Sequence, residues 1–218
     1  MEKDKGSTIL IFFINGINSL LGWNAVLAAL DYFASSFKDF NVYSFMPVPV
    51  FIGYIITGSS FHVLSNQFRY ITLIIFGNMV VNFSLVCLLI VSLTLDQTTA
   101  GFALILLCSL FIGMGANISQ LCFFAMINYL SQDVVSKFTV GTAVSGLAIG
   151  CIRAIITLIF GVKDESSNPI IIYFIIALSI NTLDILMNIK FCKSSVYKHK
   201  IDHFLLHHDK EKKKSEGS

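Results

Sequence analysis

The chain has 218 residues, of which 55% are hydrophobic and only 13% are charged, with a formal net charge of +2 and a mean hydropathy of +0.77. A soluble domain of this length carries roughly a quarter charged residues and a less apolar average, so the composition excludes a soluble globular protein. With 3 prolines and 20 phenylalanines, it predicts an all-α, polytopic membrane protein.

The first predicted element is a membrane-spanning helix at residues 8–30, after a short cytoplasmic segment of mixed charge at 1–7. About 20 apolar residues are enough to cross a bilayer. The run is longer than the apolar part of a signal peptide and further apolar runs follow it, so we expect it to be retained as the first span.

Residues 19–33 (SLLGWNAVLAALDYF) place Trp23, Asn24 and Asp31 in this otherwise apolar run. Asn24 and Asp31 are seven residues apart and therefore share one helix face, two turns from each other. A carboxylate at membrane depth is costly and normally faces protein or a water-filled cavity. Two interpretations are open. The pair belongs to a site, or Asp31 marks the water-side end of the span and Asn24 makes a structural interhelical hydrogen bond.

Five more spans are predicted, at residues 42–64, 71–95, 101–130, 138–162 and 170–189, separated by the polar stretches FKDFN, SNQFRY, DQTT, SQDVVSK and KDESSNP. Pro47 and Pro49, near the start of the second span, are compatible with a helix because its first amides have no intrahelical partner. The six spans form a transmembrane bundle at 8–190, and a basic cytoplasmic tail occupies 191–218.

The distribution of lysine and arginine predicts the orientation of these spans. The side that holds the termini would carry twelve of them, and the other side only Lys38 and Lys163, while Arg153 lies within a span. The twelve are Lys3, Lys5, Arg69, Lys137, Lys190, Lys193, Lys198, Lys200, Lys210, Lys212, Lys213 and Lys214. We therefore expect both termini to be cytoplasmic. A location in the plasma membrane is a separate expectation, which does not follow from these counts.

A polar stripe on the fourth span consists of Gly113, Asn117 and Gln120, which share one helix face. A carboxamide offers two donors and an acceptor, which suits recognition of a neutral polar ring edge. It suits a hydrogen bond between helices equally well. The residues alone leave both interpretations open.

The fifth span carries Thr142, Gly146 and Gly150 on one face, and Arg153 continues it. Gly146 and Gly150 form a small-xxx-small pair, which predicts close approach of another helix. An intramembrane arginine needs a partner or an aqueous cavity. Its candidate partners are Asp31 and Asp184, or a group outside this chain.

On the sixth span, Asn181, Asp184 and Asn188 form another one-sided stripe near the basic end of the chain. A water-facing, interfacial position and a functional site are both compatible with it.

Several kinds of chemistry have no pattern in this chain. The five cysteines are scattered singly, without the spacing of a metal or redox site. The chain has neither a phosphate-binding GxxxxGK[ST] loop nor an HExxH motif, which argues against a primary pump and an intramembrane hydrolase. We expect a protein that is not an enzyme, has no cofactor and binds no nucleic acid.

Three segments together resemble one family. GWNAVLAALDYF at 22–33, GMGANISQLCFF at 113–124 and FTVGTAVSGLAIG at 138–150 are similar, in this order, to motifs on the first, fourth and fifth helices of the equilibrative nucleoside transporters. That family has eleven helices in a major-facilitator-like arrangement of six, a cytoplasmic loop and five. The resemblance therefore implies that this chain is the amino-terminal six-helix bundle. The family's Asp/Arg motif on the eighth helix has no counterpart here.

The resemblance also implies a function, which is facilitative transport of nucleosides or nucleobases across the lipid bilayer. Trp23 would stack on or flank the base and Gln120 would hydrogen-bond its edge, with Asn24, Asn117 and Ser145 as secondary lining or packing positions. Asp31, Arg153 and Asp184 would be cavity-side or gate charges. Gly22 stands where the human-type pattern has proline, so the substrate range is left open.

Two further expectations concern partners. A six-helix part would pair with a second copy or with a separate carboxy-terminal half, because alternating access needs one bundle moving against another. The alternative is a non-transporting, half-length paralogue that acts as a membrane assembly or regulatory partner.

Overall fold

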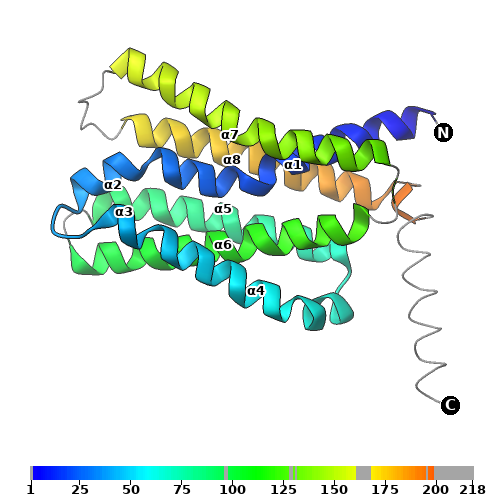
Figure 1. Cartoon of the computed structure of the whole chain (residues 1–218), viewed down its shortest axis with the longest axis horizontal. Helices are drawn as coiled ribbons and strands as arrows, with labels where there is room; N and C mark the ends of the chain where they lie inside the picture. Colours follow the sequence, from blue (N-terminus) through cyan, green and yellow to red (C-terminus); the bar gives the residue numbers. More distant parts are fainter. Residues whose placement is uncertain are drawn as a thin grey trace.

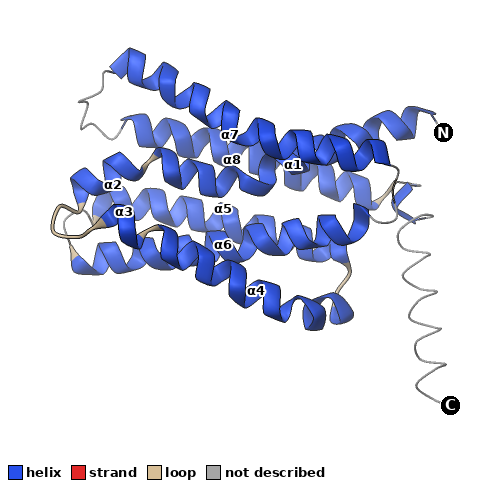
Figure 2. Cartoon of the chain, viewed as in Figure 1, coloured by secondary structure: helices blue, strands red, loops and turns tan. Residues whose placement is uncertain are grey.

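The computed structural model describes residues 2–95, 98–127, 130, 132–160, 168–194 and 196–198, and every regular element in them is helical (Figure 2). The helices are α1 (Glu2–Ala28), α2 (Leu30–Ser36), α3 (Val42–Phe45), α4 (Pro47–Gln67), α5 (Tyr70–Thr94), α6 (Thr99–Ile127), α7 (Gln132–Phe160) and α8 (Asn168–Cys192). The predicted all-α class is confirmed.

Six helical stretches in the described residues are long and apolar enough to cross a membrane. The first runs over Gly6–Ser36 and joins α1 to α2 across a single interruption at Ala29, whose amide still bonds the carbonyl oxygens of Ala25 and Val26. The second runs over Val42–Gln67 and joins α3 to α4, and the other four correspond to α5, α6, α7 and α8. The predicted number of spans and the polytopic class are therefore confirmed.

One boundary differs from the predicted ones, and one span has an internal break. The second span begins at residue 42, as predicted, but its first part is the short turn α3, capped by the side chain of Asn41, and α4 starts at Pro47. Proline is well placed there, since the first amides of a helix have no partner to lose. The polar stretch at 131–137 is not a loop over most of its length, because α7 already begins at Gln132.

Parts of several predicted segments lie outside the described residues. They are residue 1, residues 96–97 of the turn after the third span, residues 128–129 at the end of the fourth span, residue 131, residues 161–162 at the end of the fifth span, residues 163–167 of the stretch KDESSNP, residue 195, and the tail from 199 onward.

Four helices form the core of the bundle, and two lie outside it (Figure 1). In the core, α1 and α5 each pack against both α6 and α8. On the outside, α7 packs along α1 and α4 packs along α6. The start of α1 and the end of α8 lie at the same end of the bundle (Figure 1), as an even number of spans requires.

These pairings have an internal two-fold symmetry. Exchanging α1 with α6, α4 with α7 and α5 with α8 turns the pair α1–α7 into α6–α4 and the pair α5–α6 into α8–α1. The first three spans (α1, α4 and α5) are thus related to the last three (α6, α7 and α8). Because three spans is an odd number, the two groups cross the membrane in opposite directions. Paired three-helix repeats of this kind make up each half of a major-facilitator-like fold.

The two outer helices are held by equivalent glycine contacts. A Cβ on Gly16 of α1 would lie 2.2 Å from the carbonyl oxygen of Phe138 on α7, and a Cβ on Gly113 of α6 would lie 2.3 Å from that of Val50 on α4. Close backbone approach at small residues is a main source of helix association in lipid. In both halves of the bundle, a glycine on a core helix therefore lets the backbone of an outer helix come close.

The close approach predicted at Gly146 and Gly150 is wrong. A Cβ at either position would meet nothing within 4 Å. The face of α7 that packs on α1 contains Gly141 instead, where a Cβ would lie 2.2 Å from the carbonyl oxygen of Phe13. A small-xxx-small spacing allows close approach of another helix. Which face of α7 is approached depends on how the whole bundle packs.

Candidate functional site

Polar side chains in the apolar helices fall into two regions. One is an interior network among the core helices. The other, here called the exposed face, lies along the outer helices and includes Trp23, Asn24, Asp31, Gln120 and Arg153. The interior network consists of Asn15, Asn18, Asn78, Ser119, Asn181, Asp184 and Asn188, all of them buried. Each of the four core helices contributes at least one member, so the network ties these helices together.

Asp184 of α8 is the only carboxylate of the interior network, and it is completely buried. Its Oδ2 accepts two hydrogen bonds, from the carboxamide nitrogens of Asn18 at 2.8 Å and Asn78 at 2.7 Å. Its Oδ1 is buried and has no hydrogen-bond partner among the described residues. The water-facing position considered for this stripe is therefore wrong.

The carboxamides around Asp184 bond one another as well. Asn18 also donates to Oδ1 of Asn181 at 2.8 Å, and Asn181 donates to the backbone oxygen of Asn78 at 3.0 Å. The hydroxyl of Ser119 donates to Oδ1 of Asn78 at 2.9 Å. Buried polar groups need such partners because an unmade hydrogen bond in a water-free interior is costly.

A second part of the interior network lies about one turn further along α8. Asn188 donates to Oδ1 of Asn15 at 2.8 Å, and Asn15 donates back to Oδ1 of Asn188 at 3.3 Å. A reciprocal pair of this kind fixes both the register and the rotation of α1 against α8. Its members have no amide group left over for a passing solute.

Asn15, Asn18 and Ser119 are members that the sequence interpretation missed. A signal was present on the first span, because Asn15, Asn18 and Gly22 are spaced i, i+3 and i+7 and so share one helix face. That face lies against α8 and α6, opposite the one that carries Asn24.

The exposed face begins at one end of the bundle with an ion pair. Arg153 of α7 donates to Oδ2 of Asp31 on α2, and the hydroxyl of Tyr43 donates to Oδ1 of the same carboxylate at 2.8 Å. The side chains of Arg153 and Asp31 are 46% and 63% exposed. Of the two acidic partners considered for Arg153, the structure therefore selects Asp31 and places Asp184 elsewhere.

Two helix turns deeper, Asn24 of α1 donates to the hydroxyl of Ser145 on α7 at 3.1 Å. Asn24 and Asp31 thus both bond to α7, as residues on one face of the first span should. The contacts match the structural interpretation of this pair, with Asp31 exposed at the end of the span and Asn24 in an interhelical hydrogen bond.

Trp23 and Gln120 are the two half-buried residues that the resemblance assigns to the substrate. The indole ring of Trp23 lies 6.1 Å, between ring centroids, from Phe51 of α4. Asn117 uses both amide hydrogens on α4, bonding the oxygen of Tyr54 at 2.9 Å and the hydroxyl of Thr57 at 2.7 Å. Gln120 follows Asn117 on the same face of α6, one turn further along.

The predicted site residues therefore fall into two groups, those bonded to other helices and those without a hydrogen-bond partner among the described residues. Asn117 and Ser145 are buried and engaged in interhelical hydrogen bonds. The carboxamide of Gln120 and the indole N–H of Trp23 have no hydrogen-bond partner among the residues that the structure describes. Trp23 lies beside α4, and Gln120 is on the face of α6 that carries Asn117, which bonds α4. Within the described chain, no group of three or more His, Cys, Asp or Glu side chains is placed to hold a metal ion.

No family model matches the chain, and comparison with curated proteins gives no match either. The resemblance to the equilibrative nucleoside transporters therefore rests on the three sequence motifs alone. The six apolar helices are those of an integral membrane protein with several spans, and they fit a membrane transporter in general.

Proposed function

We propose that this chain is the amino-terminal six-helix part of a facilitative transporter for nucleosides or nucleobases, similar to the equilibrative nucleoside transporters. The observation that supports it best is the contrast between Gln120 and the other carboxamides at membrane depth. Asn15, Asn18, Asn78, Asn117 and Asn188 all donate to protein partners, whereas Gln120 is half-buried and has none among the described residues.

The chemistry of this pair of residues fits a nucleobase. A neutral polar solute that enters a bilayer must exchange its hydrogen bonds to water for equivalent ones, and a carboxamide offers both donors and an acceptor to a base edge. The flat indole of Trp23 offers a stacking surface, which contributes roughly 1–3 kcal/mol per base in other proteins. Asn24 and Asn117 hold α7 and α4 in place around these two side chains.

Asp31 and Arg153 have a separate role in this proposal. Their ion pair joins the first span to α7 at one end of the bundle, where both side chains are exposed. It could break and re-form during a gating motion at little cost, because exposed ion pairs contribute about 0–1 kcal/mol. Asp184 is assigned to the interior network instead, where it stabilises the four core helices and does not face a substrate.

Transport by this chain would require a second bundle. Alternating access proceeds by rocking one bundle against another around a site at the midplane. We propose that a second copy or a separate carboxy-terminal half covers the face that carries Trp23 and Gln120. The cycle needs no bound cofactor.

Binding can be tested on the purified chain, because Trp23 is its only tryptophan. Titration with adenosine or hypoxanthine should quench the intrinsic fluorescence saturably, and Gln120→Leu should weaken the effect while leaving the starting spectrum unchanged. Gln67→Leu is the matched control, since Gln67 is exposed at the end of α4. Equal quenching in both variants, or none in the unaltered chain, would contradict the proposed site.

Transport is tested by uptake of labelled adenosine or hypoxanthine in cells that lack their own nucleoside carriers. We expect uptake only when a partner half is co-expressed, and its loss in Trp23→Ala at unchanged surface expression. Saturable uptake by demonstrably monomeric chain would overturn the two-bundle proposal. Complete absence of both binding and uptake would favour the non-transporting assembly partner.

The proposed orientation, with both termini cytoplasmic, has a direct test. Single cysteines at Lys38 and Lys198, in a chain freed of its own cysteines, are exposed to a membrane-impermeant thiol reagent. Lys38→Cys should react from outside intact cells, and Lys198→Cys only after permeabilisation. The reverse pattern would show the orientation to be wrong.

A further inference from the structure

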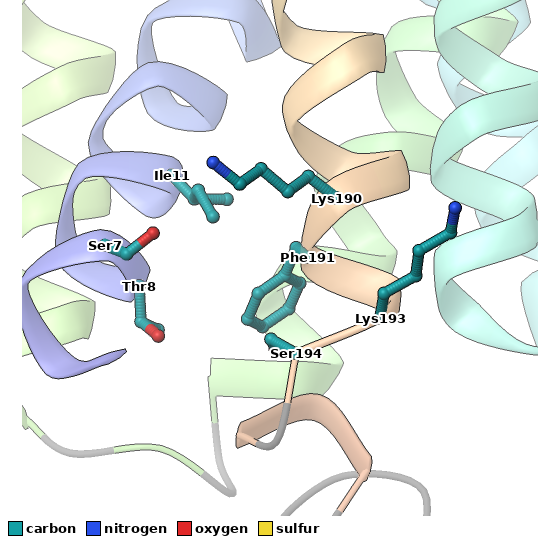
Figure 3. A pocket seen from close by; sticks show the side chains of 7 residues that line it. All are labelled: Ser7, Thr8, Ile11, Lys190, Phe191, Lys193 and Ser194. Carbon is teal, nitrogen blue, oxygen red and sulfur yellow. The ribbon is translucent and has the colours of Figure 1, made fainter. Parts of the chain in front are cut away.

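A pocket of about 320 Å³ lies between the second turn of α1 and the last turns of α8 (Figure 3). Its walls combine three kinds of group. Lys190 comes from the last turn of α8 and Lys193 from the residue that follows the helix, the hydroxyls of Ser7, Thr8 and Ser194 flank them, and Ile11 and Phe191 supply apolar surface. The volume is within the range of pockets that bind small ligands, about 300–1,000 Å³.

The charge of this pocket is positive. None of the described side chains that line it is acidic, and neither lysine has an ion-pair partner among the described residues. The carboxyl end of α8 contributes only about half a negative charge, which two ammonium groups exceed. Figure 3 shows that the side chain of Lys190 reaches towards α1, whereas that of Lys193 extends to the other side of α8. The lysine side chain is flexible, so that of Lys193 can turn toward the pocket.

The apolar part of the pocket is fixed in place. Phe191 is 1% exposed and stands edge-on to Phe12, with ring centroids 5.7 Å apart, and to Tyr197 at 5.6 Å. The hydroxyl oxygen of Ser194 accepts a hydrogen bond from the amide of Tyr197 at 3.2 Å, which leaves its own hydrogen free to donate. The ammonium group of Lys190, the hydroxyl donors and the apolar surface therefore meet at one location, and Lys193 would add a second cation once its side chain turns toward the pocket.

We propose that this pocket binds a phosphate group, carried either by the headgroup of an anionic lipid or by a soluble phosphate compound. Ammonium and hydroxyl groups are the donors that a phosphate requires, and basic pockets between the ends of transmembrane helices bind lipid headgroups in other proteins. Ile11 and Phe191 would contact the first carbons attached to the phosphate. The site is at the end of the bundle that holds both termini, away from Trp23 and Gln120, and does not depend on the proposed transport.

The test measures the thermal unfolding midpoint of the full chain in a neutral detergent. Three probes are titrated separately: dioctanoyl phosphatidylglycerol, dioctanoyl phosphatidylcholine and inorganic phosphate. The double variant Lys190→Gln/Lys193→Gln is compared with Lys137→Gln/Lys198→Gln, which removes two exposed lysines from the same end of the bundle but outside the pocket. The two variants have equal net charge.

Phosphatidylglycerol should raise the unfolding midpoint of the unaltered chain. The pocket variant should need an about thirtyfold higher lipid concentration for the same increase, because each lysine contributes about 1 kcal/mol to binding. The control variant should respond like the unaltered chain. Equal stabilisation by inorganic phosphate would assign the site to a soluble phosphate, and a response to the lipid alone would assign it to a headgroup. Equal loss in both variants, or equal stabilisation by phosphatidylcholine, would overturn the proposal. If the double variant does not fold, Lys190→Gln alone is compared with Lys198→Gln under the same criteria.

Discussion

The interior network and the exposed face use the same kinds of side chain in opposite ways. In the interior, Asp184 has no cationic partner among the described residues, yet carboxamides from two other helices donate to it. On the exposed face, Asp31 has a cationic partner, Arg153, while the carboxamide of Gln120 has no partner among the described residues. Residues of one chemical type thus hold helices together in one region and are open to other molecules in the other.

The difference follows from what surrounds each region. Lipid chains are as apolar as leucine, so burial of apolar surface does not select one helix arrangement over another. Interhelical hydrogen bonds and close glycine contacts do select one, because they are satisfied in a single register. The interior network and the Gly16 and Gly113 contacts together specify the bundle, whereas the exposed face contributes less to its arrangement.

The largest effect is expected at the centre of the interior network. Asp184→Ala removes the acceptor for Asn18 and Asn78 and leaves two buried donors without a partner. Because each such donor costs about 1–3 kcal/mol in a protein interior, the free energy of unfolding should fall by about 2–6 kcal/mol. Reversible unfolding in mixed detergent micelles, followed by circular dichroism, measures this change.

The matched variant is Asp184→Asn. Its single carbonyl oxygen can occupy the position of Oδ2, which accepts both hydrogen bonds, and its amide nitrogen can occupy the position of Oδ1, which has no partner among the described residues. The stability should therefore fall by less than in the alanine variant, because Asn18 and Asn78 keep their acceptor, while the new amide hydrogens are buried in place of a desolvated charge. A loss as large as that of the alanine variant would show that the negative charge itself is required, and the account based on hydrogen bonds would fail.

The next effect concerns the glycine contacts that place the outer helices. A Cβ on Gly141 would lie 2.2 Å from a backbone oxygen of α1, whereas a Cβ on Gly146 meets nothing within 4 Å. Gly141→Ala should destabilise by about 1–3 kcal/mol through overpacking, and Gly146→Ala should leave the free energy of unfolding unchanged or slightly higher. Equal losses in the two variants would show that α7 packs through a different face.

Much of the bundle could be predicted from the sequence. Long apolar runs separated by polar stretches identify six spans, because the thickness of the bilayer sets the length of each. The polar stretch before the fifth span was wrongly predicted to be a loop, because polar residues such as Gln132 can extend a helix beyond its apolar run. The interruption at Ala29 has no glycine or proline to signal it.

The interior network could be predicted only in part. The stripe of Asn181, Asp184 and Asn188 is visible in the sequence, and so is its one-sidedness. Its partners Asn15 and Asn18 lie more than 160 residues away along the chain, and helical periodicity does not state which helix a face meets. For the same reason the spacing of Gly146 and Gly150 does not reveal that the contact lies at Gly141, five residues earlier and on another side of the helix.

A smaller effect is expected at the ion pair of the exposed face. Arg153→Gln should lower the stability by about 0.2–1 kcal/mol, because both partners are exposed and solvent screens their attraction. Asp31→Asn should cost a similar amount, and the double variant little more than either single one, since all three remove the same interaction. Losses that simply add would show that the two side chains act independently.

The smallest effect on stability is expected at Gln120. Its carboxamide has no hydrogen-bond partner among the described residues, so Gln120→Leu removes no interaction within the chain. The free energy of unfolding should change by less than about 0.5 kcal/mol, because the leucine keeps most of the side-chain volume and a half-buried polar group is lost. Asn117→Leu is the comparison one turn away, where the same exchange breaks two hydrogen bonds to α4 and should cost more than about 1 kcal/mol. A loss at Gln120 as large as that at Asn117 would reveal a structural partner for Gln120, and this side chain would then belong with the interior network and not with the face that is open to a solute.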